Sequence, residues 1–342
     1  DPAAAVNALL RAGKNVAMIT EGDEKGNFIC SYEDFLTIAK DYVITATGVY
    51  GANYKAAVIL NPLVFLPGKP ANNTSGYVET TLRSGSYNYR FDWLALTAMG
   101  FTMTEDLSKA NVIVGSQKLS DEALGAVKAG TPYMAYGATA FMGEGNFLLG
   151  LGVKLDSCTM GTDFLGRVVY PNNTLVNASY INEADDVMYE YGTNWFTKIP
   201  EGATVLVQNA GKTPLQGCIC LTDDELTEEF NKYNNGVVGF EYQSGKLDMA
   251  LFANVLNHKI HQTDEYTFIS NFIFSRSLTE TAYEGVAQPE NPDPVNPGKP
   301  EEPGKPDAPK TGDTSSIIVW VLAASFTVVM IPMTVTLKRK AR

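Results

Sequence analysis

The fold is decided by two short stretches, Asn111-Val-Ile-Val-Gly115 and Thr131-Pro-Tyr-Met-Ala-Tyr136. Both are apolar and rich in β-branched or aromatic residues, as is typical of strands that are buried on both faces of a parallel sheet. Between them, Ser120 is followed by two acidic residues, which is the pattern of a helix start, and the helix should end at Gly130. A strand, a helix and a strand with short connections predict a βαβ unit of an open, doubly wound α/β sheet.

The same alternation extends in both directions from this unit. Upstream, we expect a helix over 90–99 that ends at Gly100, and a short strand over 101–104. Near the beginning of the chain, an amphipathic helix over 7–13 should lead into a strand over 15–20. The remaining apolar segments are 203–207, 217–221 and 236–242, expected as strands, 247–255, expected as a strand or a helix, and 266–277, expected as a long helix.

The other end of the chain carries an apolar run from Ile317 to Leu337, and four of the five residues that follow it are basic. As a helix with a rise of 1.5 Å per residue, this run would be about 31 Å long, which matches the hydrocarbon core of a bilayer. We therefore predict one transmembrane helix over 317–337. The basic residues indicate that its end lies in the cytoplasm and that the preceding chain lies outside the cell.

A short motif precedes the apolar run and consists of Ala308, Pro309, Lys310, Thr311 and Gly312. The order of motif, apolar helix and basic end resembles the sortase sorting signal of Gram-positive surface proteins, whose pattern is Leu-Pro-x-Thr-Gly, with Ala308 in place of leucine. The resemblance implies that a sortase cuts between Thr311 and Gly312 and joins Thr311 to peptidoglycan. The mature protein would then be extracellular and anchored to the cell wall. The alternative is an ordinary C-terminal membrane anchor.

Residues 288–310 are expected to be a linker, because eight of the 17 prolines of the chain lie there. From Pro294 to Pro309, proline recurs at every third position, which matches the three residues per turn of a polyproline II helix. A stiff spacer of this kind suits a folded part that has to reach through a cell wall.

The charge of the chain excludes some partners. The formal net charge is −12, in spite of the basic C-terminal end. Such an acidic surface is unfavourable for binding to nucleic acids or to anionic lipids. The four cysteines are too few and too scattered to predict a disulfide framework.

The chain opens with Asp1-Pro-Ala-Ala-Ala, without a methionine or a secretion signal, so we expect it to be the C-terminal fragment of a longer exported protein. The changes in composition divide it into four parts. These are 1–75, the end of a preceding α/β region or a small subdomain, 76–287, an α/β domain, 288–310, the linker, and 308–342, the sorting signal with the transmembrane helix.

Residues 5–13, 130–140, 245–252 and 266–272 carry a second resemblance. In pattern and order they resemble the C-terminal region of secreted bacterial zinc carboxypeptidases of the carboxypeptidase A/T type, in which a glutamine-amidotransferase-like domain follows the peptidase domain. The resemblance implies that 76–287 contain the flavodoxin-like sheet of class I amidotransferases. It also implies that zinc is bound by a peptidase domain upstream of residue 1, which would be the partner of this domain in cis. No cofactor is expected in the chain itself.

An amidotransferase needs a nucleophilic cysteine at a sharp turn between a strand and a helix, with a histidine as its partner. The corresponding turn consists of Gly137, Ala138 and Thr139, directly after the strand over 131–136, and it contains no cysteine. Without an adjacent base, Thr139 is a poor nucleophile. The sequence therefore predicts a degenerate nucleophile elbow and no catalytic residue.

His258 and His261 are the two histidines of the chain. On a helix they would share a face, but neither begins a His-x-x-Glu pattern and no third histidine is present to complete a zinc site. They are weak candidates for metal ligands, and we predict no metal site in this chain.

Two functions are left open by these observations. The first is that of a non-catalytic accessory and surface-anchoring part of an exported zinc metallocarboxypeptidase, which removes C-terminal residues from peptides. The second is that of a cell-surface binding or adhesion module without enzymatic activity. In the second case, the aromatic residues within 84–89 and Trp93 would form a patch for a sugar or a peptide. Core packing is the simpler explanation of the same aromatic residues.

Overall fold

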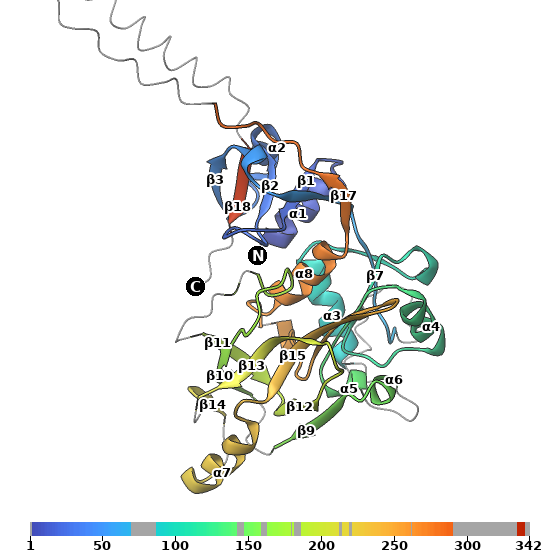
Figure 1. Ribbon diagram of the computed structural model, residues 1–342, viewed down its shortest axis with the longest axis vertical. Helices are drawn as coiled ribbons and strands as arrows, with labels where there is room; N and C mark the ends of the chain where they lie inside the picture. The colour runs from blue at the N-terminus through green and yellow to red at the C-terminus, as the bar shows by residue number, and fades with distance from the viewer. Residues whose placement is uncertain are drawn as a thin grey trace, which may run out of the picture.

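The chain folds around a small sheet and a large sheet, with helices packed between them (Figure 1). The computed structural model describes residues 2–69, 87–141, 147–158, 163–178, 180, 186–211, 214–218, 221–260, 262–289 and 334–338.

The small sheet has the strand order β17-β4-β1-β2-β18-β3, and all neighbouring strands are antiparallel. Its strands are β1 (Val16–Ile19), β2 (Phe28–Ser31), β3 (Thr45–Val49), β4 (Ala56–Ile59), β17 (Leu278–Ala282) and β18 (Thr334–Lys338). The accompanying helices are α1 (Pro2–Arg11), α2 (Tyr32–Ile38) and the 3₁₀ turn η1 (Gly51–Asn53).

The large sheet combines a parallel half with an antiparallel half. The parallel half has the order β6-β5-β7-β8-β16, and the antiparallel half continues it as β15-β13-β10-β11. The parallel strands are β5 (Leu63–Phe65), β6 (Thr102–Thr104), β7 (Val112–Gly115), β8 (Tyr133–Tyr136) and β16 (Leu247–Phe252). Counted along the chain, this is the order 2-1-3-4-5 of flavodoxin-like sheets, so the predicted α/β class is confirmed and the parallel half is consistent with a flavodoxin-like fold.

The remaining elements surround these strands. The other strands of the large sheet are β9 (Lys154–Ser157), β10 (Asp163–Val169), β11 (Val187–Tyr191), β12 (Asn194–Lys198), β13 (Thr204–Ala210), β14 (Gln216–Cys218) and β15 (Val237–Ser244). The helices are α3 (Tyr87–Ala98), α4 (Asp121–Ala129), α5 (Ala138–Phe141), α6 (Phe147–Gly150), α7 (Asp223–Tyr233) and α8 (Tyr266–Ser275), with the 3₁₀ turns η3 (Leu107–Lys109) and η4 (His258–Ile260).

The parallel strands are buried on both faces because helices cover both faces. On one face, Val112 and Val114 of β7 belong to a core with residues of α3 and α8. On the other face, Ile113 belongs to a second core with Ala123 and Val127 of α4. The alternation of side chains along a strand thus divides the continuous apolar runs of the sequence between two helix layers.

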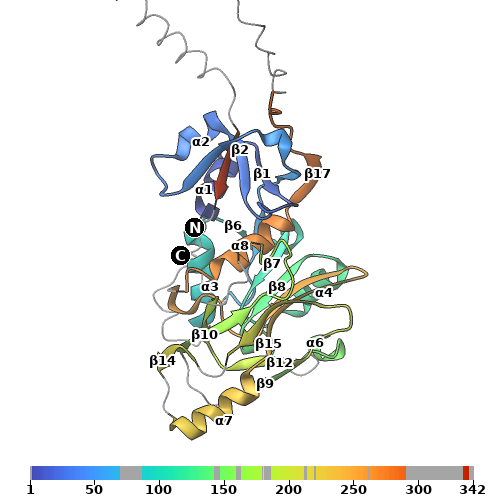
Figure 2. The ribbon, with the colours of Figure 1, turned by 60° about the vertical axis from the view of Figure 1, so that its left-hand side comes forward.

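The layer of α3 and α8 also joins the two sheets. Helix α1 lies against it, and the core on this side continues into β1 and β2 of the small sheet (Figure 2). The ring of Phe28 in β2 meets that of Phe274 in α8 edge to face, with 5.1 Å between the ring centres. Asn7 of α1 donates a hydrogen bond of 2.9 Å to the carbonyl oxygen of Met99, directly after α3. One apolar core therefore holds both sheets.

The large sheet is inserted into the small one. The chain passes from β4 of the small sheet to β5 of the large sheet, and it returns from α8 to β17, which pairs with β4. At the crossing point, the backbone N–H of Leu60 donates to the carbonyl oxygen of Ser277 over 2.9 Å. The predicted domain boundary between residues 75 and 76 lies outside the described residues; on either side of it, Leu63–Phe65 pair with β6 and β7, and Leu278–Ala282 belong to the small sheet.

Near the C-terminus, the structure has a strand where the sequence predicted the end of a transmembrane helix. Thr334–Lys338, which include the end of the predicted helix over 317–337, form β18 between β2 and β3. Three consecutive β-branched residues, Thr334, Val335 and Thr336, favour a strand here, and two neighbouring strands offer their backbone groups for pairing. The rest of the predicted helix lies outside the described residues. Among the described residues, no helix has the length and apolar character needed to cross a membrane.

Most other sequence predictions of elements in the parallel half are confirmed. The helix that ends before Gly100, the strand–helix–strand unit from β7 to β8 and the final helix α8 all form within a few residues of the expected bounds. The ambiguous segment 247–255 is a strand over Leu247–Phe252, because it lies between β8 and β15 in the sheet.

Candidate functional site

A pocket with a volume of about 1010 Å³ lies at the carboxyl ends of β5, β6 and β7. At β5 the order of the parallel strands reverses, because β6 lies on one side of β5 and β7 on the other. In open doubly wound sheets, ligands bind at such a switch point, since the loops that leave the neighbouring strands diverge there. The pocket is therefore the candidate binding site.

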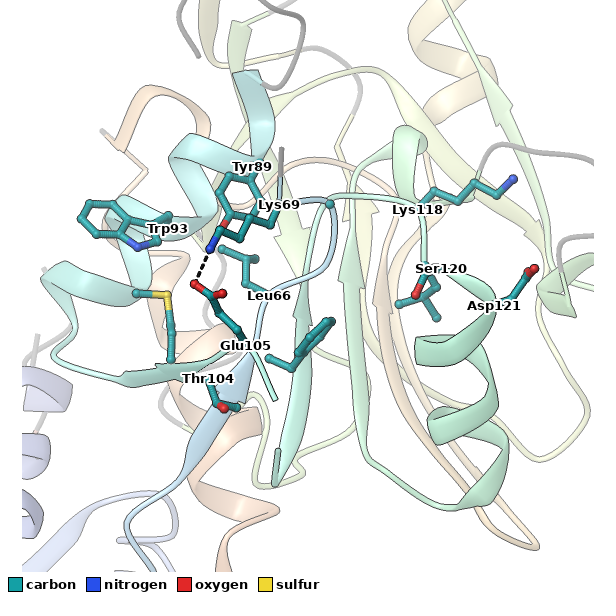
Figure 3. A pocket seen from close by; sticks show the side chains of 13 residues that line it. Leu66, Lys69, Tyr89, Trp93, Thr104, Glu105, Lys118, Ser120 and Asp121 are labelled. Carbon is teal, nitrogen blue, oxygen red and sulfur yellow. Dashed lines mark hydrogen bonds and ion pairs between the residues drawn. The ribbon is translucent and has the colours of Figure 1, made fainter. Parts of the chain in front are cut away.

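One wall of the pocket combines an ion pair with aromatic rings (Figure 3). Lys69, in the loop after β5, forms an ion pair with Glu105, directly after β6. Tyr89 and Trp93 of α3 lie on the same side of the pocket as this pair. A ligand in the pocket would meet charged hydrogen-bonding groups and flat apolar surfaces on the same wall.

The opposite wall comes from the loop after β7 and the first turn of α4, where Lys118, Ser120 and Asp121 lie (Figure 3). The hydroxyl oxygen of Ser120 accepts a hydrogen bond of 3.2 Å from the backbone N–H of Ala123 and so caps α4. The loops after β5 and β7 approach each other at Gly68, which has φ +80°. A Cβ atom at this position would lie 2.6 Å from the Gln117 side chain, so this approach requires glycine.

Tyr89 contributes a neutral hydroxyl group to the pocket. Its side chain is buried, and burial raises its pKa to about 12, with smaller contributions from the charges of Glu105 and Asp92. At physiological pH the hydroxyl group keeps its proton and can donate a hydrogen bond.

Asp92 is the centre of a buried polar network behind the pocket wall. Its carboxylate accepts hydrogen bonds from the backbone N–H and the hydroxyl group of Ser116, at 2.8 and 2.7 Å. Tyr136 donates to it over 2.9 Å and Asn257 over 2.8 Å. Burial raises the pKa of Asp92 to about 6, although each of these hydrogen bonds acts in the opposite direction. The network joins α3, β7, β8 and the loop after β16 at one edge of the sheet.

The elbow is next to this network. Tyr136 ends β8, Gly137 has φ +87°, and Ala138 begins α5. A Cβ atom at position 137 would lie 2.7 Å from a methyl carbon of Val255. Position 137 therefore requires glycine. Thr139 lies two residues further on and is exposed.

The loop after β16 continues past a second buried acid. Glu190 of β11 accepts a hydrogen bond of 2.6 Å from Asn254, and Asn254 also donates to the hydroxyl group of Tyr233 over 3.3 Å. Burial raises the pKa of Glu190 to about 8. Glu265, directly before α8, accepts a hydrogen bond from the backbone N–H of Tyr189, and burial raises its pKa to about 7. These acids hold the loop in place from inside the fold.

The first candidate metal ligand, His258, is part of this loop and is buried. Its ring stacks on Tyr191 with 3.3 Å between the ring centres, and Phe91 meets it edge to face at 5.8 Å. Its backbone N–H donates to the side-chain oxygen of Gln262. The second candidate, His261, lies outside the described residues. Among the residues that are described, no group of three His, Cys, Asp or Glu side chains could hold a metal ion.

The structure describes some of the predicted site residues and not others. The sorting motif, 308–312, and the first residues of the aromatic patch, 84–86, lie outside the described residues. Tyr89 and Trp93 of that patch line the pocket. The Lys69–Glu105 pair was not predicted from the sequence. A usable signal was present, because Glu105 directly follows β6 and Lys69 follows β5 after three residues, and functional side chains gather at the carboxyl ends of parallel strands.

No known protein family matches the chain, and no curated protein matches it either. Several solved structures are similar in fold. A candidate GMP synthase component from Thermoplasma acidophilum is 13% identical with a TM-score of 0.36, and the match covers 62% of this chain and 92% of that chain. A candidate ThuA-like protein from Bacteroides uniformis is 14% identical with a TM-score of 0.37, with 61% and 88% covered. A glutamine amidotransferase from Thermotoga maritima is 9% identical with a TM-score of 0.35, with 63% and 97% covered.

Similarity at these TM-scores and identities does not indicate what chemistry this chain performs. The flavodoxin-like strand order follows from the hydrogen-bonded pairing within the chain itself.

Proposed function

We propose that the chain is a non-catalytic accessory domain of an exported protein, with an amidotransferase-like sheet that has lost the catalytic residues of that class. The parent protein is a zinc metallocarboxypeptidase that acts on peptides outside the cell, and the C-terminal sorting signal anchors it to the cell wall. The zinc-binding residues belong to the peptidase domain.

The observation that carries this proposal is the elbow at Gly137. In an amidotransferase the nucleophile stands at this kind of turn, held between a strand and a helix. Here the turn consists of Gly137, Ala138 and Thr139 and contains no cysteine, and Thr139, two residues after Gly137, stands where that nucleophile would be. A turn of this kind without a cysteine supports the proposal that the sheet and the turn serve as a scaffold.

A second candidate function, a cell-surface binding module without enzymatic activity, is favoured by the pocket at the carboxyl ends of β5, β6 and β7. The two proposals are compatible, since an accessory domain can hold a ligand near the peptidase.

The test of the non-catalytic proposal uses the purified full chain. We expect substoichiometric zinc by elemental analysis, no release of ammonia from glutamine, and no release of C-terminal residues from peptides. The control is the variant His258→Ala, which removes the described candidate ligand and should leave all three measurements unchanged. Stoichiometric zinc, or turnover that disappears in His258→Ala, would contradict the proposal.

A further inference from the structure

We propose that the pocket at the carboxyl ends of β5, β6 and β7 binds an uncharged saccharide of two or more sugar rings. The inference deepens the binding-module function proposed above and rests on it. Four features of the pocket support it: its charge, its helix terminus, its aromatic wall and its size.

Among the lining residues that the structure describes, the positive and negative charges balance. Lys69 and Lys118 are matched by Glu105 and Asp121, and Lys69 is directly paired with Glu105. An ion pair offers a donor and an acceptor side by side, which is the arrangement that a pair of neighbouring hydroxyl groups requires. An anionic ligand would have to compete with Glu105 for Lys69, whereas an uncharged sugar can bond to both groups without separating them.

The helix terminus in the pocket is also unfavourable for an anion. Phosphate groups often bind at the first turn of the helix that follows a strand of such a sheet, because free backbone N–H groups and the helix dipole favour negative charge there. In α4, Ser120 already caps the backbone N–H of Ala123, and Asp121 and Glu122 place two acidic residues in the first turn. This arrangement disfavours a nucleotide or another phosphate ester.

The aromatic wall and the size suit a saccharide. Sugar rings present flat faces of C–H groups that stack on aromatic rings, and the half-buried Trp93 offers such a ring beside the ion pair (Figure 3). The neutral hydroxyl group of Tyr89 adds a donor. A volume of about 1010 Å³ lies at the upper end of the range for small-molecule sites, so it exceeds the needs of a single sugar ring.

The experiment is a calorimetric titration of the full chain in a detergent that has no sugar head group. The probes are chitotetraose, whose N-acetylated rings resemble the glycan of a cell wall, cellotetraose, which lacks the acetamide groups, and inorganic phosphate. We expect at least one tetrasaccharide to bind and phosphate not to bind. A preference for one tetrasaccharide identifies which source of sugar the site accepts.

Substitutions at Trp93 and Glu105 test whether the saccharide binds in this pocket. Trp93→Ala should weaken saccharide binding about tenfold through the loss of stacking, and Trp93→Phe should retain most of it and guards against misfolding. Glu105→Gln leaves Lys69 without its counter-charge, so it should weaken saccharide binding and allow phosphate to bind. The matched control is Tyr32→Ala, because Tyr32 is an exposed aromatic residue at the start of helix α2, which accompanies the small sheet.

The outcomes separate this inference from the proposed lack of catalysis. If neither tetrasaccharide binds, if phosphate binds in their place, or if Trp93→Ala binds like the unchanged chain, the saccharide site is refuted and the non-catalytic proposal is unaffected. Chromatography of the recovered tetrasaccharide gives the converse case. Cleaved sugar would overturn the non-catalytic proposal while the saccharide site stands.

Discussion

Asp92, Glu190 and Glu265 are buried carboxyl groups in one domain, and burial raises the pKa of each to about 6, 8 and 7. They differ in what surrounds them. Asp92 accepts hydrogen bonds from three residues, which offset part of the cost of a buried charge. Glu190 has fewer donors around it, and its pKa rises furthest above that of an exposed carboxyl group. At neutral pH it is a protonated acid inside the core.

The raised pKa of Glu190 predicts that the protein becomes less stable as the pH rises. The folded state holds the proton up to about pH 8, whereas the unfolded chain releases it near its ordinary pKa of 4.5. The contribution to stability is therefore complete below pH 4.5 and is lost as the pH rises from there to pH 8, with a slope of at most about 1.4 kcal/mol per pH unit. Glu265 and Asp92 act in the same direction over narrower ranges.

The measurement is the free energy of unfolding in urea at pH 5, 6, 7 and 8. The variant Glu190→Gln keeps the shape and the acceptor for Asn254 but cannot ionise, so its stability should fall less between pH 5 and pH 8 than that of the unchanged chain. Glu201→Gln, in an exposed turn before β13, is the control and should follow the unchanged chain. Equal slopes for all three proteins would show that Glu190 is already ionised in the folded state.

At the scale of the elements, the pairing of β18 with β2 can be tested directly. Its Val335 pairs with Cys30 of β2, and Thr336 pairs with Ile29. We expect Val335→Cys to form a disulfide with Cys30 under mild oxidation, because the two positions face each other across antiparallel strands. Thr336→Cys is the control, since successive residues of a strand point to opposite faces. Mass spectrometry of the unreduced peptides identifies the pair.

The comparison of the two variants decides between the strand and the membrane helix predicted from the sequence. A disulfide with Cys30 in Val335→Cys alone places the segment in the small sheet. If neither variant is cross-linked to Cys30, or if both are to the same extent, the strand pairing is wrong for the chain in solution.

The elements that the sequence predicted are those with a local signal. Ser120 before two acids, glycine after α3 and α4, and the apolar runs of β7 and β8 are each explained by a few neighbouring residues. Other features depend on distant parts of the chain. Nothing near Leu63–Phe65 or Leu278–Ala282 tells which of two sheets each joins, because that choice depends on strands far away in sequence. For the same reason, only part of the pocket lining could be predicted from the sequence. Lys69 and Glu105 come together only through the pairing of β5 with β6.

At the scale of the whole molecule, the proposed sorting signal can be tested. When the chain is exported behind a secretion signal by a Gram-positive host that has a sortase, it should be recovered covalently joined to peptidoglycan. Thr311→Ala removes the residue that would be joined to the wall, so the protein should move to the membrane fraction. Thr314→Ala, three residues further on, is the control and should stay in the wall. Equal wall fractions for both variants would contradict sorting at Thr311.

The insertion of the large domain between β4 and β17 has a mechanical consequence. A tether attached beyond β17 pulls first on the hydrogen bonds between β17 and β4 and on the bond between Leu60 and Ser277. As long as these hold, tension passes across the small sheet and bypasses the large domain, whose chain enters and leaves at neighbouring points. The small sheet would then act as a mechanical clamp that lets the pocket keep its shape while the chain is under tension.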